Sequence, residues 1–124
     1  MTVWESGRES ALLDDIIAGR KTIEGRLNRG KFADYVVGDT VLLRRDFRDE
    51  NGYLQDGYPR AAEVIITAIR YYSSFIEMVA AEGYQNVIPA APNGQSAANE
   101  YNKYYTAADQ AKYGVLAIEV KVLA

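Results

Sequence analysis

Residues 19–26 read Gly19-Arg20-Lys21-Thr22-Ile23-Glu24-Gly25-Arg26, and they mark the point where a predicted helix ends and a predicted strand begins. Apolar residues recur at helical spacing before this stretch and stop at Gly19, a residue type that commonly ends helices in a left-handed conformation. Four charged side chains then follow within seven residues. Such a concentration either protects an exposed edge strand or forms a functional site. On this stretch alone both interpretations stay open.

Outward from this stretch, the pattern predicts a mixed chain with strands of unequal length. Helices are expected at residues 9–18, 74–82 and 96–105, with a helical turn or loop at 106–112 and a loop at 87–94. Strands are expected at residues 2–5, 20–27, 40–45, 60–72 and 114–122. Helices inserted among about five strands, rather than alternating with them, predict an α+β fold built on a small β-barrel. A doubly wound sheet is excluded because residues 27–72 leave no room for crossover helices.

The composition limits both the architecture and the chemistry. A chain of 124 residues, 48% hydrophobic and 25% charged, is typical of one globular domain, expected over residues 1–124. No apolar run reaches the length of a membrane span, and the absence of cysteine fits a cytoplasmic protein. The absence of both histidine and cysteine excludes Ser-His and Cys-His nucleophiles and the usual zinc sites. We therefore expect no metal and no other cofactor.

Charge is distributed unevenly along the chain. The net charge is −3, yet residues 20–48 hold eight basic and four acidic side chains, which gives this stretch +4. The remainder holds six basic and thirteen acidic side chains, which gives −7. Such a local basic footprint suits a ligand that carries phosphate, although a solvated pair of strands would also produce it.

The order of the motifs resembles a known family. Gly19-x-Lys21-x-x-Glu24-x-Arg26 is followed by a Gly38-Asp39 turn, by Tyr72-x-x-Phe75, by Glu82-Gly83, by Tyr101-x-x-Tyr104-Tyr105 and by the closing segment 113–118. This order is similar to that of the ASCH family, whose hallmark is the G-x-K-x-x-E-x-R segment. The resemblance covers nearly the whole chain and implies a PUA-like β-barrel with a cleft beside that segment, suited to RNA or to a nucleobase.

The resemblance also implies an alternative activity. Some small members of the family are amidohydrolases that remove the acyl group from N4-acetylcytidine, and others are linked to RNA binding, RNA cleavage or coactivation of transcription. The catalytic set of the amidohydrolase branch looks like a lysine, a threonine three residues later and a glutamate beyond the following helix. The resemblance places its lysine at Lys21 and its glutamate at Glu82. Its threonine, three residues after the lysine, is replaced here by Glu24. The implied partners are RNA or a modified nucleoside.

Three groups of side chains are expected at the site. The candidate catalytic residues are Lys21, Glu24 and Glu82. The candidate substrate-binding residues are Arg26, Tyr84, Tyr104 and Tyr105. The candidate nucleic-acid contacts are Arg29, Lys31, Arg44 and Arg45. Each group has a structural alternative: a same-face ion pair of Glu24 with Arg26, packing of the tyrosines, and a solvated hairpin for the arginines and Lys31.

The position of Lys21 decides whether these groups converge. In a regular strand Glu24 and Arg26 share one face while Lys21 points away. Lys21 therefore meets Glu24 only if it lies on the turn before the strand, or if the strand bulges, for which Gly25 is suited. To act as a nucleophile or base, Lys21 also needs burial or cationic neighbours that lower its pKa from roughly 10.4.

Overall fold

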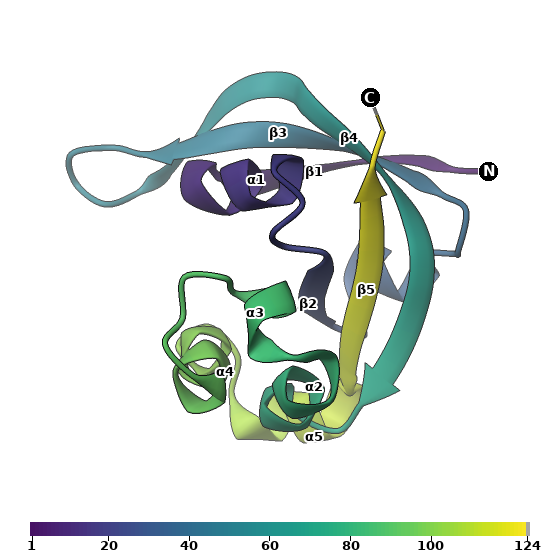
Figure 1. Ribbon diagram of the computed structural model, residues 1–124, viewed down its shortest axis with the longest axis vertical. Coiled ribbons are helices and arrows are strands. Elements are labelled where there is room, and N and C mark those ends of the chain that lie inside the picture. The colour runs from purple at the N-terminus through teal and green to yellow at the C-terminus, as the bar shows by residue number, and fades with distance from the viewer. Residues whose placement is uncertain (124) are drawn as a thin grey trace.

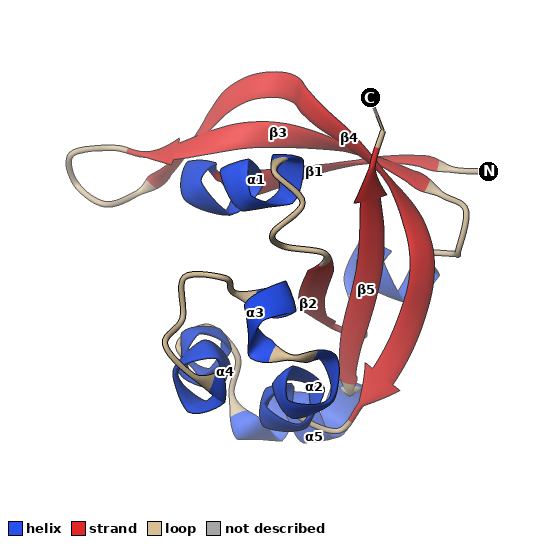
Figure 2. Cartoon of the chain, in the orientation of Figure 1, coloured by secondary structure: helices blue, strands red, loops and turns tan. Residues whose placement is uncertain are grey.

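The computed structural model describes residues 1–123 as five strands with helices inserted between them (Figures 1 and 2). The strands are β1 (Val3–Glu9), β2 (Ile23–Leu27), β3 (Thr40–Arg48), β4 (Leu54–Tyr72) and β5 (Val115–Val122). The helices are α1 (Ser10–Ile17), the 3₁₀ helix η1 (Gly30–Asp34), α2 (Phe75–Glu82), α3 (Tyr84–Val87), α4 (Gly94–Asn102) and α5 (Ala107–Tyr113). The predicted α+β class with five strands is confirmed.

All five strands belong to one sheet in the order β1-β3-β4-β5-β2. The β1–β3 pair is parallel, with Val3 opposite Thr40, and the other three pairs are antiparallel. Among residues 1–123 no ladder joins β1 to β2, so the curved sheet is not closed into a full barrel. The two edge strands instead face each other across the fold.

The N-terminal strand is longer than the sequence suggested. Ser6 and Glu9 have capping-box spacing, but residues 3–9 form one strand and α1 begins at Ser10 without a side-chain cap. Pairing with β3 along seven residues of β1 satisfies backbone groups that a helix N-terminus would have left open. Gly19 ends α1 with a φ of 79°, as expected, and β2 begins only at Ile23.

The C-terminal half contains more helix than predicted. Ser74 caps α2 by accepting the backbone N–H of Glu77, and Asn93 and Thr106 cap α4 and α5 in the same way. The expected loop at 87–94 is preceded by α3, and the expected turn at 106–112 is the helix α5. No helix among residues 1–123 is long and apolar enough to cross a membrane.

Two hydrophobic cores lie at opposite ends of the sheet. The first packs α1 against β3, β4 and β5, through side chains such as Leu13, Leu43 and Ile66. The second packs α2, α3 and α4 against β2 and β5, through side chains such as Phe75 and Val87. Figure 1 shows α1 beside one end of the curved sheet and α2–α5 gathered at the other. The turn from α1 to β2 therefore runs between the two cores.

Candidate functional site

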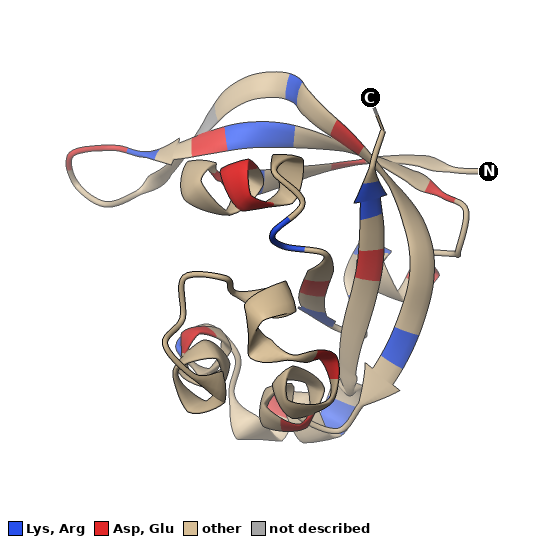
Figure 3. Cartoon of the chain, in the orientation of Figure 1, with Lys and Arg blue, Asp and Glu red and all other residues tan. Residues whose placement is uncertain are grey.

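Lys21 lies on the turn between α1 and β2. This is the first of the two arrangements that would allow it to meet Glu24. This turn carries basic residues and crosses the space between α1 and α3 (Figure 3). The Lys21 side chain is buried, and its Nζ donates to the carbonyl oxygens of Ile23 at 2.7 Å and Val87 at 2.5 Å. Burial lowers the pKa of Lys21 to about 8, with Arg8 and Arg26 adding to the shift against the opposing charge of Glu24.

Glu24 is the anionic centre around which the cations of the site gather. Its Oε2 lies 2.9 Å from Arg8 Nε and 3.8 Å from Arg26 Nε, and its Oε1 lies 4.0 Å from Lys21 Nζ. Burial alone would raise the pKa of Glu24, but Arg8, Lys21 and Arg26 together hold it at about 2. The carboxylate is therefore ionised at neutral pH. Within residues 1–123 its buried Oε1 has no hydrogen-bond partner.

Arg8 is a site residue that the sequence analysis missed. It lies on β1, whereas Glu24 lies on β2, so their ion pair joins the two unpaired edges of the sheet. Its Nη1 also donates to Ser6 Oγ at 2.6 Å and to Gly7 O at 2.7 Å. Had the N-terminal strand been extended to residue 9, strand alternation would have placed Trp4, Ser6 and Arg8 on one inward face. An arginine predicted on the inward face of a strand would have indicated that Arg8 belongs to the site.

A cavity of about 500 Å³ opens above these residues. We call Arg8, Lys21, Glu24 and Arg26 the cavity floor, and Tyr101, Tyr104 and Tyr105 of α4 and the turn after it the tyrosine wall. The other lining residues come from the junction of β1 and α1, from Gly25 of β2, from the segment 88–92 and from α4. The volume lies in the range of pockets that take a small organic ligand, roughly 300–1,000 Å³. Charged and aromatic groups thus face one shared space.

Gly25 lets the tyrosine wall approach β2 closely. A Cβ on Gly25 would lie 2.8 Å from the Cζ atom of Tyr101 and 2.8 Å from the Cε atom of Met78. The pairing of β2 with β5 shows no register shift, so the bulge considered at Gly25 is absent. Tyr101 in turn stacks on Phe75 with ring centroids 4.4 Å apart, and Tyr105 stacks on the same ring at 5.2 Å. Tyr101 and Tyr105 of the wall are therefore held by the second core, whereas Tyr104 is exposed.

Arg26, one of the predicted substrate-binding residues, lines the cavity from β2. Its guanidinium lies over the ring of Phe32, 4.7 Å from the centroid. Burial would lower the pKa of Arg26, but Glu24 and the hydroxyl of Tyr105 reverse the effect and raise it. Arg26 therefore remains a cation at the edge of the cavity.

Two predicted site residues do not line the cavity. The Glu82 carboxylate accepts hydrogen bonds from Arg70 Nε and Nη2, both at 2.6 Å, and from the Tyr72 hydroxyl at 2.5 Å. These bonds lower its pKa, Arg70 contributing most. Tyr84 is half-buried in α3 and packs against the second core. The structure thus separates Glu82 and Tyr84 from Lys21 and Glu24.

The four predicted nucleic-acid contacts are dispersed. Arg29 pairs with Asp109 at 3.6 Å, and Arg45 binds Asp14 and Ser10 of α1 at 2.9 and 2.7 Å. Arg44 makes a two-pronged ion pair with Asp46. Lys31 donates to Glu5 O at 2.6 Å and lies beside Phe32, next to Arg26. Of the four, Lys31 shares an aromatic neighbour, Phe32, with a residue of the cavity floor, Arg26.

Comparison with known proteins places the chain in a family. The family model for the ASCH domain matches residues 10–124. The crystal structure of the hypothetical protein PH0355 superposes with a TM-score of 0.81 and is 33% identical, covering 98% of this chain and 100% of that one. The solution structure of PF0455 from Pyrococcus furiosus has a TM-score of 0.76 at 33% identity, covering 98% of each chain.

A more distant structure shares the fold alone. The protein EF3133 from Enterococcus faecalis V583 has a TM-score of 0.62 at 14% identity, and the match covers 99% of this chain and 76% of that one. The search of curated proteins gave no significant match. The family match over nearly the whole chain, together with two structures of the same extent at 33% identity, shows that the chain belongs to the ASCH domain family.

Proposed function

We propose that the cavity binds a nucleobase, either of a nucleoside or of an unpaired position in RNA. The observation that carries the proposal is the meeting of the charged cavity floor with the tyrosine wall in one cavity of about 500 Å³. A nucleobase is planar, so its face can stack on tyrosine rings at roughly 1–3 kcal/mol per base. Its edge carries hydrogen-bond donors and acceptors side by side.

The floor supplies complementary groups for such an edge. The Glu24 carboxylate, ionised and with Oε1 unpartnered among the described residues, accepts an N–H of the base. Arg26 and Lys21 donate to a ring nitrogen or carbonyl oxygen of the base. A site that pairs polar groups with a ligand edge rejects ligands that would leave those groups unpaired. The ASCH family membership supports the same class of ligand.

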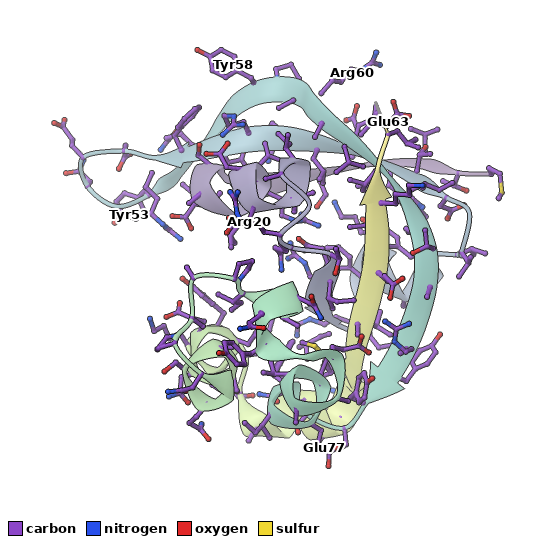
Figure 4. All side chains as sticks on the ribbon, viewed as in Figure 1. Arg20, Tyr53, Tyr58, Arg60, Glu63 and Glu77 are labelled. Carbon is purple, nitrogen blue, oxygen red and sulfur yellow. The ribbon has the colours of Figure 1, made fainter. Side chains whose placement is uncertain are left out.

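Calorimetric titration of the four ribonucleosides and of short single-stranded RNA tests this function. We expect Glu24→Gln and Tyr104→Ala each to weaken binding at least about tenfold, since each removes roughly 1.4 kcal/mol or more. Glu63→Gln and Tyr71→Ala are matched controls, because Glu63 is exposed (Figure 4) and Tyr71 is 70% exposed against 66% for Tyr104. Equal losses in the controls, or no binding by the unmodified protein, would exclude a nucleobase site.

A second function, amide hydrolysis of an N4-acylated cytidine, is favoured by the pKa of Lys21. At about 8 this pKa leaves a useful fraction of neutral amine near neutral pH. The neutral amine takes a proton from water, the resulting hydroxide adds to the acyl carbonyl, and the ammonium returns the proton to the departing N4 amine. Acetate and cytidine are the products. Glu24, with a pKa of about 2, serves as a fixed charge rather than as a proton carrier.

The hydrolase hypothesis has its own assay. The protein is incubated with N4-acetylcytidine, and cytidine is measured by chromatography between pH 6 and pH 10. Because only the neutral amine is active, the rate should rise with pH through a midpoint near 8 and vanish in Lys21→Met. Lys121→Met, at an exposed lysine of β5, is the control. Absence of turnover, or turnover that survives Lys21→Met, would leave binding as the function.

A further inference from the structure

The cavity floor carries more positive than negative charge. Among the described residues, the cations Arg8, Lys21 and Arg26 surround the single carboxylate of Glu24, at distances of 2.9, 4.0 and 3.8 Å. Even when Lys21 is neutral, two guanidinium groups share one carboxylate. Buried charge that is incompletely paired is costly, and a ligand that brings a negative charge removes part of that cost.

The remaining acidic groups of the cavity do not balance this excess. Glu9 and Glu100 line the cavity away from its floor. Glu9 pairs with Arg48 at 3.3 Å, and Glu100 pairs with Lys103 at 2.8 Å. Each of these carboxylates is therefore matched by a cation of its own. Among the residues that line the cavity, the unmatched positive charge therefore lies on the floor.

Exposure to the cavity distinguishes Arg26 from Arg8. The side chain of Arg8 is only 5% exposed, its Nη1 donates to Ser6 and Gly7, and its Nε lies 2.9 Å from Glu24. The Nε of Arg26 is buried and, like that of Arg8, has no hydrogen-bond partner within the part of the chain that the structure describes, but the Arg26 side chain is 24% exposed and lines the cavity. Arg26 is thus the guanidinium with donors available to an incoming acceptor. Guanidinium groups bind phosphate with two parallel hydrogen bonds.

Positive charge continues beyond Arg26 onto the surface. The ammonium of Lys31 lies 5.4 Å from the centroid of the same Phe32 ring that Arg26 covers. Lys31 is exposed. Partial burial lowers the pKa of Lys31, and the positive charges of Arg8, Arg26 and Arg44 lower it further. An anionic group at Arg26 would therefore be attracted by both residues.

We propose that the Arg26 end of the cavity is a subsite for the phosphate of a nucleotide, so that the preferred ligand is a nucleotide rather than an uncharged nucleoside. This proposal rests on the proposed function, because the tyrosine wall takes the base while Arg26 and Lys31 take the phosphate. A free nucleoside monophosphate and a phosphodiester within RNA offer the same chemistry, and the experiment separates them.

The experiment compares ligands that differ only in phosphate. The protein is titrated with each ribonucleoside, its 5′- and 3′-monophosphates, inorganic phosphate, and a trinucleotide with the preferred base at its centre. We expect a monophosphate to bind at least about tenfold more tightly than its nucleoside at low salt. The advantage should shrink when salt is raised to about 0.3 M, since screening weakens exposed charge pairs. Tighter binding of the trinucleotide than of either monophosphate would identify RNA as the source of the phosphate.

Variants locate the subsite. Arg26→Gln should abolish the advantage of the monophosphate, and Lys31→Ala should reduce it severalfold. Lys121→Ala, at an exposed lysine of β5, should keep the full advantage. Circular dichroism checks that Arg26→Gln is folded. Because Lys31 is exposed, the Lys31 variant retains a readout even if the Arg26 variant does not fold.

The outcomes separate this proposal from the proposed function. Equal affinity for nucleoside and monophosphate would overturn the phosphate subsite and leave the nucleobase site intact. Binding of inorganic phosphate that is lost in Arg26→Gln, without binding of any nucleoside or nucleotide, would overturn the nucleobase site and retain Arg26 as an anion site. No binding of any of these ligands would overturn both proposals.

Discussion

Two glutamates with lowered pKa values, Glu24 and Glu82, belong to ion-pair networks of different composition. Glu24 lies on the cavity floor, where three cations surround it and its Oε1 has no hydrogen-bond partner in the described chain. Glu82 lies at the end of α2, where Arg70 and Tyr72 satisfy both of its carboxylate oxygens. Arg70 also binds Glu119 at 2.7 Å, so there two carboxylates share one cation.

The two networks differ in how completely their polar groups are paired, and therefore in what a further molecule could add. Around Glu82, a half-exposed arginine and a complete set of hydrogen bonds leave nothing for a further molecule to supply. Around Glu24, burial is nearly complete while hydrogen bonding is incomplete. A buried polar group without a partner costs free energy in the unliganded protein, and a ligand that completes the pairing recovers it. Of the two glutamates, Glu24 has this property and Glu82 does not.

The largest effect expected from this comparison is on stability. Glu24→Gln removes the charge that offsets three cations, two of which (Arg8 and Lys21) are buried, so we expect the free energy of unfolding to fall by about 3–5 kcal/mol. Glu82→Gln should cost about 1 kcal/mol, because Arg70 is 40% exposed at its side chain and keeps Glu119 as a partner. Urea unfolding at pH 7 measures both. Equal losses in the two variants would remove the distinction drawn between the networks.

The second prediction concerns the pH dependence that Lys21 gives to folding. Its pKa is about 8 in the folded chain against the ordinary lysine value of 10.5, so between these values the unfolded chain holds a proton that the folded chain has lost. Stability contributed by Lys21 therefore rises as pH increases from 8 to 10.5, by up to about 3 kcal/mol. Below pH 8 the destabilising effect of the buried ammonium is present in full.

The measurement compares unfolding of the unmodified protein and Lys21→Met in urea at about pH 7.5 and about pH 10, on either side of the folded-state pKa. Other groups, tyrosines among them, titrate in both proteins, so the difference between the two proteins isolates Lys21. We expect this difference to change in favour of the unmodified protein at the higher pH. A difference that does not vary with pH would mean that the amine is not desolvated as its burial implies.

The parts of this site that the sequence predicted are encoded locally. Gly19 ends α1 at a positive φ, and the turn that follows brings Lys21 within 4.0 Å of Glu24, three residues away. The family resemblance supplied the G-x-K-x-x-E-x-R pattern, and alternation along the strand placed Glu24 and Arg26 on one face. Residues close in sequence can adopt only a few relative positions, so contacts between them can be deduced from their spacing.

The parts that the sequence did not predict depend on pairing between distant segments. Arg8 reaches Glu24 only because β1 pairs in parallel with β3, which places it across the open side of the sheet from β2. The side chain of Glu82 is directed by Arg70 of β4, a partner that helical periodicity alone does not reveal. Each of these contacts is set by tertiary packing, which overrides what a single segment prefers.

The third prediction tests whether the cavity depends on the missing side chain of Gly25. In Gly25→Ala the new Cβ would lie 2.8 Å from atoms of both Met78 and Tyr101, so both contacts must be relieved and Tyr101 must shift relative to β2. We expect a loss of about 1–3 kcal/mol in stability, together with weaker ligand binding as the tyrosine wall shifts. Gly94→Ala is a matched control, since its Cβ would meet only Val79, at 3.7 Å. Normal ligand affinity in Gly25→Ala would show that the position of Tyr101 does not matter for binding.

The smallest effect is expected at Tyr72, the tyrosine of the Glu82 network. Tyr72→Phe removes one of the three hydrogen bonds that Glu82 accepts, so unfolding should become easier by about 1 kcal/mol or less. Ligand affinity should not change, because neither Tyr72 nor Glu82 lines the cavity. Tyr101→Phe, which removes a hydroxyl from the tyrosine wall, should weaken binding while Tyr72→Phe does not. If Tyr72→Phe weakened binding as much as Tyr101→Phe, the Glu82 network would be coupled to the cavity. Glu82 would then have to be considered again in the role that the resemblance to the amidohydrolase branch implies.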